Sequence, residues 1–570
     1  MSKKALTGIF LGLVTALSSL SAKGDVTYDY IIVGNGTAGA VLARKLTDSG
    51  KKSVLVLEAG INHDNDPEVL NTNQGVLLND FTDLTFNPKY AETYGVPVFF
   101  PLTGIVYSEG RGWGGSSLHN YMQVIRGTPD IYDAWATLSG NPLWNYANTL
   151  SRILSFINYT PCLTISNPSQ EGMGGPISIT QTLPVTMDPF GIALNTTTGT
   201  PFVDDINDPT QGLIGISAFQ AFATATAPCS LGVRSFSSRE FLDSVTKITP
   251  TGGVGKGSRL LRIESNAYVN NIIFDGKKAI GVRFFYSNQP NKALKAYGKK
   301  IILCAGSINT PAILQRSGIG DPAVLEPLAI KVRINNPNVG ANLVNQYGGT
   351  AIAFLPGGTN ATPFFQALIN GSTTPALPSP FDYPNDTTRR LQLDAFQIAP
   401  DVVQILPFLV QPNSRGSVKI VNTNPLIQPL LDLNMYSDGP VTTNGTDANL
   451  SVATYQLINA VVTGAGGTMI YPPPADFVVS PGNPNPPATL LMDAKQKIIA
   501  LSHTVGTCRM GTSPSNSVVD GNLHVHGAKN LMIVDASAIP KIPNGSVCFG
   551  VYMLAEGALS ILGVSPSPGL

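Results

Sequence analysis

The chain has little charge and no excess of either sign. Only 13% of its 570 residues are Asp, Glu, Lys or Arg, and 36 basic side chains balance 36 acidic ones. Such a surface has no broad field of one sign to gather nucleic acid or anionic lipid, so nucleic acid is not an expected partner. Histidine is also scarce, and the five in the chain leave few candidates for a base that works near neutral pH.

Cysteines are few and carry no metal-binding pattern. The chain has five cysteines, none in a CxxC arrangement and none at a spacing typical of metal ligands, so no metal site is predicted. Cys162 and Cys229 lie in Pro- and Thr-rich sequence and could pair in an oxidising compartment. Cys304, Cys508 and Cys548 lie in apolar stretches and are expected to be buried thiols.

Long apolar runs do not occur after the N-terminal stretch. A membrane span needs about 20 apolar residues in a row, so no stable membrane insertion of the mature chain is expected. In residues 1–22, Lys3 and Lys4 precede an uncharged run that closes with small residues up to Ala22. This layout is typical of an export signal, with an uncleaved anchor as the alternative. We expect cleavage near Ala22 and a secreted, extracellular or periplasmic protein.

Glycine-rich turns between short strands and helices are abundant. Residues 29–60 have the pattern of a strand, a glycine turn, a helix and a second strand, which is a βαβ unit. Strand and turn patterns return at residues 300–307 and 531–562, and Pro- and Thr-rich sequence with short alternating strands lies between these blocks. We therefore predict an α/β fold with two lobes (α+β), in which an inserted β-sheet domain interrupts a discontinuous Rossmann-type domain.

The expected domains follow from these blocks. The Rossmann-type domain comprises residues 26–150, 230–330 and 500–570, and the inserted domain comprises residues 151–229 and 331–499. A chain of this length has room for two such domains.

The βαβ unit carries a dinucleotide-binding pattern. Gly34 permits a tight turn, Gly36 lets the backbone approach a pyrophosphate, and Gly39 lets the helix pack on the strand. Glu58 ends the second strand, where it can bond ribose hydroxyls and repel a 2′-phosphate, which disfavours NADP. An incidental glycine-rich turn is the alternative, and the pattern alone does not separate NAD from FAD. The expected cofactor-binding residues of this turn are Gly34, Gly36, Thr37, Ala38, Gly39 and Glu58.

Three further segments resemble the glucose-methanol-choline (GMC) family of FAD oxidoreductases. They are a glycine-rich segment from Gly110 to Asn120, a turn and helix from Gly306 to Gly320, and a C-terminal block that begins at Ser502. The similarity extends over almost the full mature chain. It implies that the Rossmann-type domain binds FAD, that the inserted domain binds substrate, and that the protein oxidises the CH–OH group of an alcohol or sugar.

The resemblance also implies which residues contact FAD. The glycine-rich segment would lie against the flavin, Val269 would touch the adenine through its backbone, and the strand end near Asp535 would contact the phosphates and the ribityl chain. These additional cofactor-binding residues are Gly114, Gly115, Ser116, His119, Asn120, Val269, Asp535 and Ala536.

The catalytic pair of the family faces the flavin, and the matching histidine here is His503. An imidazole suits the removal of the hydroxyl proton because its unperturbed pKa is about 6.5. The second member is usually His or Asn, whereas this chain has Ser546, a hydroxyl that can orient an oxygen but cannot carry a positive charge. Asn544 could take its place if the loop shifts.

Several alternatives stay open at the level of sequence. His119 stands where some members of the family attach FAD covalently, so it is either a covalent link or a histidine beside the ring. Molecular oxygen or a quinone could accept the electrons. Other flavin chemistry such as a lyase reaction, or a non-catalytic FAD-containing structural protein, is possible on the same scaffold.

Overall fold

The structure is a computed structural model of the chain. It describes residues 26–72, 88–95, 106–183, 189–211, 214–357, 365–370, 390–441, 443 and 446–564. The predicted export signal, residues 1–22, lies outside the described residues. Among the described helices, none combines the length and apolar character that a membrane span requires.

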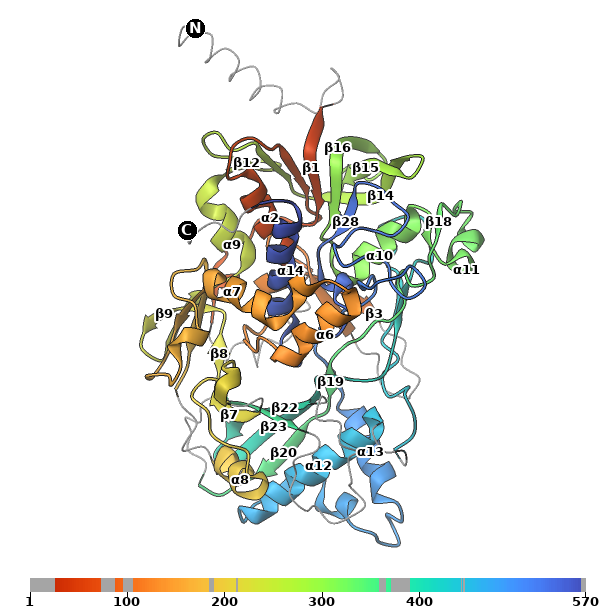
Figure 1. The fold of residues 1–570 in the computed structure, drawn as a ribbon. Coiled ribbons are helices and arrows are strands. Elements are labelled where there is room, and N and C mark those ends of the chain that lie inside the picture. The colour runs from red at the N-terminus through yellow and green to blue at the C-terminus, as the bar shows by residue number, and fades with distance from the viewer. Residues whose placement is uncertain are drawn as a thin grey trace.

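The first lobe is built around a sheet of nine described strands (Figure 1). β1 (Thr27–Val33) lies at its centre, with β2 (Val54–Leu57) on one side and β16 (Leu294–Leu303) on the other, and all three are parallel. Parallel strands are buried on both faces, which explains the apolar runs at residues 31–33, 54–57 and 301–303. The remaining strands of this sheet are β11 (Thr246–Thr249), β12 (Gly252–Gly255), β13 (Leu261–Glu264), β14 (Ala267–Asp275), β15 (Lys278–Tyr286) and β28 (Leu531–Ile533).

Two helices from opposite ends of the chain cover this sheet side by side (Figure 1). α2 (Thr37–Thr47) follows β1, and α14 (Val547–Ile561) follows the last strand. Their buried side chains belong to one apolar core with the sheet. Because α14 packs on α2, the C-terminal block lies beside the glycine turn that starts α2.

The second lobe holds a sheet of eight described strands, whose pairings are all antiparallel, with helices on one face (Figure 1). On β22 (Arg390–Ala399) and β23 (Val402–Leu409), odd-numbered side chains such as Leu393 and Ile405 pack in one core with α12 (Asp447–Gly464). The other strands are β7 (Gly215–Ala218), β19 (Tyr347–Gly348), β20 (Ala351–Phe354), β21 (Phe365–Asn370), β26 (Thr468–Tyr471) and β27 (Ile499–Ala500). The two-lobed α/β fold expected from the sequence is thereby confirmed.

The other described elements connect or cover the two sheets. They are α3 (Pro67–Leu70), β3 (Ala91–Gly95), β4 (Val106–Gly110), α6 (Pro129–Ser139), α7 (Tyr146–Phe156), β5 (Ile157–Thr160), β6 (Ile177–Gln181), α8 (Pro189–Thr198), β8 (Gln220–Ala221), β9 (Ala223–Ala227), β10 (Ser230–Arg234), α9 (Ser237–Leu242), α10 (Gly306–Arg316), β17 (Ile319–Gly320), α11 (Pro322–Leu325), β18 (Ile334–Asn335), β24 (Ser417–Lys419), β25 (Leu430–Asp432) and α13 (Pro486–Gln496).

One segment packs differently from its predicted domain. The first segment of the predicted inserted domain is residues 151–229, but Phe156, Ile157 and Ile177 within it belong to the core of the first sheet. The ring of Phe156 lies 4.6 Å from that of Tyr552 on α14. The Pro- and Thr-rich sequence around this segment gave no sign that it would be buried in the first lobe. The other domain boundaries stay predictions.

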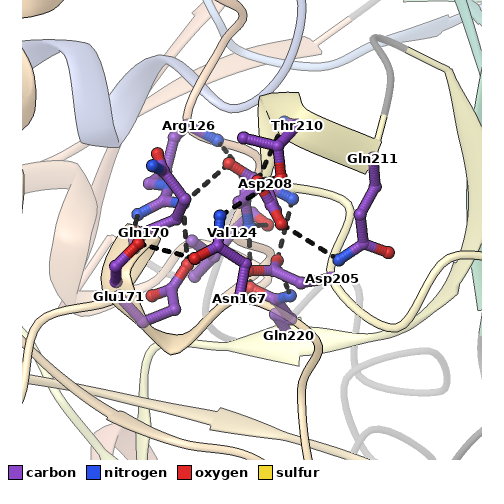
Figure 2. Close-up of polar contacts among 12 residues, drawn as sticks. Val124, Arg126, Asn167, Gln170, Glu171, Asp205, Asp208, Thr210, Gln211 and Gln220 are labelled. Carbon is purple, nitrogen blue, oxygen red and sulfur yellow. Dashed lines mark hydrogen bonds and ion pairs between the residues drawn. The ribbon is translucent and has the colours of Figure 1, made fainter.

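A polar cluster beneath this segment holds it to the first lobe (Figure 2). Arg126 forms a buried ion pair of 2.7 Å with Glu171 and donates to the backbone oxygen of Asn207. The Asn207 side chain in turn accepts from the backbone N–H of Arg126 and donates to Gln220. These bonds fix the chain around Arg126, which lies next to the residues that line the candidate site.

The cysteine predictions are confirmed. Cys162 and Cys229 form a disulfide, Cys304 and Cys508 are buried thiols, and Cys548 is a partly buried thiol. No cluster of His, Cys, Asp or Glu suited to a metal occurs in the part of the chain that the structure describes.

Candidate active site

A cavity of about 330 Å³ lies where the two lobes meet. This volume is within the range of about 300–1,000 Å³ that is common for small-molecule and cofactor sites. One part, which we call the cofactor half, is lined by the glycine turn after β1, the end of β2, the start of β14 and the start of α10. The other part, the substrate half, is lined by Tyr121, Met122, Gln123, Phe219, Asp394, Leu406, Phe408, Ile499, Leu501, His503 and Ser546.

The glycine turn is closely packed, as predicted. Gly34 has φ +98°, and a Cβ there would overlap the carbonyl oxygen of Cys304. A Cβ on Gly39 would overlap the carbonyl oxygen of Gly34, so only glycine lets α2 approach the strand this closely. Gly36 lines the cavity at the start of the helix, where free N–H groups and the helix dipole favour an anion.

Glu58 lies in the cofactor half at the end of β2. Its carboxylate accepts hydrogen bonds from the backbone N–H of Asn35 at 2.7 Å and of Gly60 at 2.8 Å. Burial raises the pKa of this carboxyl, and the backbone donors oppose the rise. The side chain is therefore held in one orientation beside the glycine turn, together with Thr37 and Ala38, which also line the cavity.

The second glycine-rich segment lies directly on the first. Gly115 has φ +53°, and a Cβ there would lie 2.8 Å from the Cα of Gly36. Gly114, at φ +102°, is not part of the cavity wall and packs on Phe236. Ser116 lines the cavity, and its Oγ accepts from the backbone N–H of Gly110 at 3.0 Å.

His119 lines the cavity, and neither of its ring nitrogens has a hydrogen-bond partner. Burial, and then the nearby Arg234 guanidinium, lower the pKa of this imidazole to about 4, so the ring is neutral. Arg234 also donates to the Oδ1 of Asn120, which fixes that cavity residue. A buried imidazole whose nitrogens have no protein partner requires an explanation, and a group bound in the adjoining cavity would be one.

The remaining predicted cofactor residues lie at the edges of the sheet. Val269 on β14 and Ala536 after β28 line the cavity. Asp535 lines it too, and its Oδ2 accepts from the backbone N–H of Gly306 at 3.1 Å and from Thr310 at 2.6 Å. Asp535 therefore ties the C-terminal strand to the start of α10.

His503 lies at the wall of the substrate half, and its ring orientation is set by Gln346. The Nδ1 atom of His503 lies 2.6 Å from the Oε1 of Gln346. The amide nitrogen of Gln346 faces three backbone carbonyls, those of Val410, Pro543 and Gly545, so its oxygen must face the histidine. An oxygen acceptor requires the proton on Nδ1, which leaves the Nε2 lone pair of His503 free.

Gln346 was not among the residues predicted from the sequence, and neither was Asn345, whose Oδ1 accepts from the backbone N–H of His503 at 2.8 Å. No catalytic pattern marks either residue in the sequence. Loss of contact with bulk water lowers the pKa of His503 to about 4, so its imidazole is an unprotonated base near neutral pH.

The two alternatives for the second catalytic residue separate in the structure. Ser546 lines the cavity just before α14, and its Oγ lies 3.4 Å from the carbonyl oxygen of Ile125. Asn544 does not line the cavity. Its amide accepts from the backbone N–H of Thr128 and donates to the Thr128 hydroxyl, so the expected catalytic position is corrected to a structural one.

The other histidines lie outside the cavity wall. His524 is near Asp520, and His526 is 3.0 Å from the hydroxyl of Ser517. His63 is buried, and its ring packs edge-on against that of Tyr90, with 4.9 Å between the ring centres.

Comparison with known proteins places this architecture in a family. The model of the N-terminal part of GMC oxidoreductases matches residues 28–348, and the C-terminal model matches residues 412–555. The chain belongs to the GMC oxidoreductase family.

Similar individual proteins agree with this assignment. The chain is 29% identical to an oxygen-dependent choline dehydrogenase of Proteus mirabilis, over 95% of this chain and 97% of the relative. Pyridoxine 4-oxidase from Mesorbium loti has the same fold, with a TM-score of 0.75, 22% identity and coverage of 94% of this chain and 99% of that one. A fungal aryl-alcohol oxidase gives a TM-score of 0.74 at 20% identity, over 95% and 99% of the two chains.

The cavity fits FAD, the cofactor of this oxidoreductase. The glycines leave room for a pyrophosphate at the start of α2, Glu58 lies where it can accept from a ribose, and His119 presents unpartnered nitrogens. His503 lies in the other half of the same cavity. The prediction of an FAD-dependent GMC oxidoreductase is confirmed.

Proposed function

We propose that the protein oxidises the CH–OH group of a small alcohol, with His503 as the base. FAD, when bound, supplies the acceptor for the hydride that leaves the carbinol carbon. The free Nε2 of His503 accepts the hydroxyl proton, so that the carbonyl product forms as proton and hydride depart. The Ser546 hydroxyl orients the substrate oxygen by one hydrogen bond.

A single observation carries this proposal. The tautomer of His503 is set by Gln346, which leaves an unprotonated nitrogen at the wall of the cavity that also contains the dinucleotide turn. A general base can act only if its nitrogen is unprotonated and its lone pair points toward the proton that it removes.

The test is an anaerobic screen of alcohols that follows bleaching of the flavin absorbance. We expect at least one alcohol to bleach the flavin, and His503→Ala to remain yellow but unbleached. Normal reduction of His503→Ala would remove this residue from the mechanism. A fully reducible flavin that no alcohol bleaches would overturn the proposal.

Three finer features belong to the same proposal. The unpartnered nitrogens of His119 support a covalent bond to FAD. The electrons then pass to molecular oxygen or a quinone, which measurement of oxygen uptake and quinone reduction distinguishes. The disulfide between Cys162 and Cys229, together with the uncharged run that follows Lys4, supports export to an oxidising compartment.

A further inference from the structure

A carboxyl group that the proposed mechanism does not use lines the cofactor half of the cavity. Glu109 is the next-to-last residue of β4, is half-buried and forms part of the cavity wall. Its carboxyl group packs against the start of α10, because a Cβ on Gly306 would lie 3.2 Å from the Oε2 of Glu109. A cofactor bound in this half would remove the group further from water.

Close packing places Glu109 beside the glycine turn. The next residue, Gly110, has no room for a side chain, since a Cβ there would overlap the carbonyl oxygen of Gly115. Gly115 in turn lies on the turn itself, because its own Cβ would be 2.8 Å from the Cα of Gly36. Glu109 is therefore next to the position at which the pyrophosphate of FAD would meet the start of α2.

Glu109 faces two other carboxylates. Glu92 on the neighbouring strand β3 is its direct partner in the antiparallel pair, and both side chains line the cavity. Side chains that are directly opposite one another in such a pair have Cβ atoms about 5 Å apart, so two like charges there repel. At the start of α10, Asp535 accepts from the backbone N–H of Gly306, the residue against which Glu109 packs.

No cationic side chain pairs with Glu109 in the part of the chain that the structure describes. Arg111 and Arg316 line the cavity, but Arg111 donates to the hydroxyl of Tyr268 and Arg316 donates to the carbonyl oxygen of Asn270. A buried carboxyl group without a counter-charge is more stable in its neutral form.

The surroundings of Glu109 favour the carboxylic acid. Burial raises the pKa of Glu109 to about 8, the hydroxyl of Ser307 opposes the rise, and the charges of Glu92 and Asp535 add to it. Ser307 donates to Oε1 at 2.9 Å, which leaves Oε2 to carry the proton. The hydroxyl of a carboxylic acid is a hydrogen-bond donor, whereas a carboxylate can only accept.

FAD would bring further negative charge into this half. Its pyrophosphate is an anion that accepts hydrogen bonds, as the start of α2 requires. An ionised Glu109 would repel this anion, and the loss of water from the cavity would strengthen the repulsion. A protonated Glu109 carries no charge and presents a donor.

We propose that Glu109 binds FAD as a neutral carboxylic acid, so that the cofactor binds tightly only when this side chain is protonated. The Oε2 hydroxyl donates a hydrogen bond to the anionic part of FAD, and Oε1 accepts from Ser307. Where the empty site has lost this proton, binding of FAD takes one proton from the solvent, and the affinity falls as the pH rises.

The test measures the affinity for FAD against pH and needs no turnover. The full chain loaded with FAD is diluted at values from about pH 7 to about pH 9.5, and the fluorescence of released FAD gives the dissociation constant. The parent chain and all variants carry His119→Leu, so that no covalent bond holds the cofactor. We expect the dissociation constant to rise about thirtyfold over this range, the factor for one required proton with a pKa of about 8.

Variants assign this rise to Glu109. Glu109→Gln keeps the shape and a donor but has no proton to lose, so its dissociation constant should be within about threefold of the parent value at pH 7 and should not rise. Ser307→Ala removes a donor that favours the anion, and we expect the rise to begin at a higher pH. Glu240→Gln is the matched control, because burial also raises the pKa of Glu240 but this residue lies outside the cavity wall. The control should keep the thirtyfold rise.

Other groups near Glu109 do not confuse this comparison, because all of them are unchanged in Glu109→Gln. The titratable and charged groups that face Glu109 or line the cavity beside it are Glu92, Tyr94, Tyr107, Arg111, Arg316 and Asp535.

A second measurement detects the proton itself. At about pH 9, the infrared difference spectrum between the parent holoenzyme and the Glu109→Gln holoenzyme should contain the C=O stretch of a protonated carboxylic acid, and the band should shift in heavy water. Bound FAD keeps the proton on Glu109 at a pH at which the empty site loses it.

The possible outcomes decide the proposal. A dissociation constant that stays the same from about pH 7 to about pH 9.5 in the parent chain would overturn it, as would a rise that persists in Glu109→Gln. Tighter binding of FAD by Glu109→Gln at pH 7 would show that Glu109 is ionised there and would also overturn the proposal. No alcohol enters these measurements, so a chain that oxidises none still yields the binding profile, and the two proposals fail separately.

Discussion

Gln346 and His503 share a hydrogen bond of 2.6 Å between Oε1 and Nδ1. The same glutamine donates to the carbonyl oxygens of Pro543 and Gly545, in the loop that ends at Ser546. One amide therefore holds both His503, the proposed base, and the loop that carries Ser546. In the proposed reaction Gln346 would act as a positioning residue.

Replacing Gln346 by Leu should slow flavin reduction by about ten- to a hundredfold, by analogy with the loss of partners that orient metal-binding histidines. FAD content should not change, because Gln346 does not line the cavity. Single-turnover bleaching measures the rate. Gln346→Glu keeps an acceptor for Nδ1–H and should recover part of the rate, whereas the exposed Gln289→Leu should have no effect. Equal rates in Gln346→Leu and the unmodified enzyme would contradict the role.

The pH dependence of the reaction should show no protonation of His503 between about pH 5 and pH 8. Its pKa is lowered to about 4, so the imidazole loses its basic form only as the pH falls through about 4. The rate of bleaching by a neutral alcohol measures this dependence. A bleaching rate that falls with decreasing pH through about 6.5, the ordinary pKa of histidine, would contradict the desolvation of the base.

Acid precipitation tests the link to His119. We expect the yellow colour to stay with the precipitated protein, because the neutral and unpartnered imidazole is available for bonding. His119→Leu should release all colour to the supernatant while still binding FAD before precipitation. Colour in the supernatant of the unmodified protein would show that His119 only lies beside the ring.

Ser546 and Asn544 should respond differently to replacement by Ala. Ser546→Ala removes a donor at the cavity wall and should lower the rate of flavin reduction by up to about a hundredfold, with little change in stability. Asn544→Ala leaves the backbone N–H of buried Thr128 without an acceptor and should lower the free energy of unfolding by about 1–3 kcal/mol. Urea unfolding followed by flavin release, beside bleaching rates, separates the two effects. A slower reaction with unchanged stability in Asn544→Ala would restore that residue to catalysis.

Gly115→Ala should weaken FAD retention, because the added Cβ would lie 2.8 Å from the Cα of Gly36 in the dinucleotide turn. Gly257→Ala is the control, since Gly257 also has positive φ, +63°, but no atom lies within 4 Å of its added Cβ. Both variants bear the backbone strain of a left-handed alanine, and only Gly115→Ala should lose FAD on gel filtration. Equal loss in both would mean that strain alone is responsible.

Local patterns in the sequence were sufficient to predict the dinucleotide-binding turn. Gly34, Gly36, Gly39 and Glu58 act within one βαβ unit, where spacing and strand order dictate the geometry. The pairing of Cys162 with Cys229 was also accessible, because both lie in loop sequence and few cysteines compete. The sequence could not show that Ser546 lines the cavity and Asn544 does not. Both residues lie in one loop, and no local pattern in the sequence sets the conformation of that loop.

The amino-acid sequence by itself determined the two-lobed fold and the FAD cradle, since both depend on short motifs whose backbone geometry follows from residue type, and it predicted His503 as the candidate base. The tertiary structure decided the tautomer of His503 and the surroundings of Glu109. Both depend on contacts between residues far apart in the chain: Gln346 meets His503 only when β19 and β27 pair, and Ser307 meets Glu109 only when the start of α10 meets the end of β4. Such contacts arise from tertiary packing, and no local pattern in the sequence predicts them.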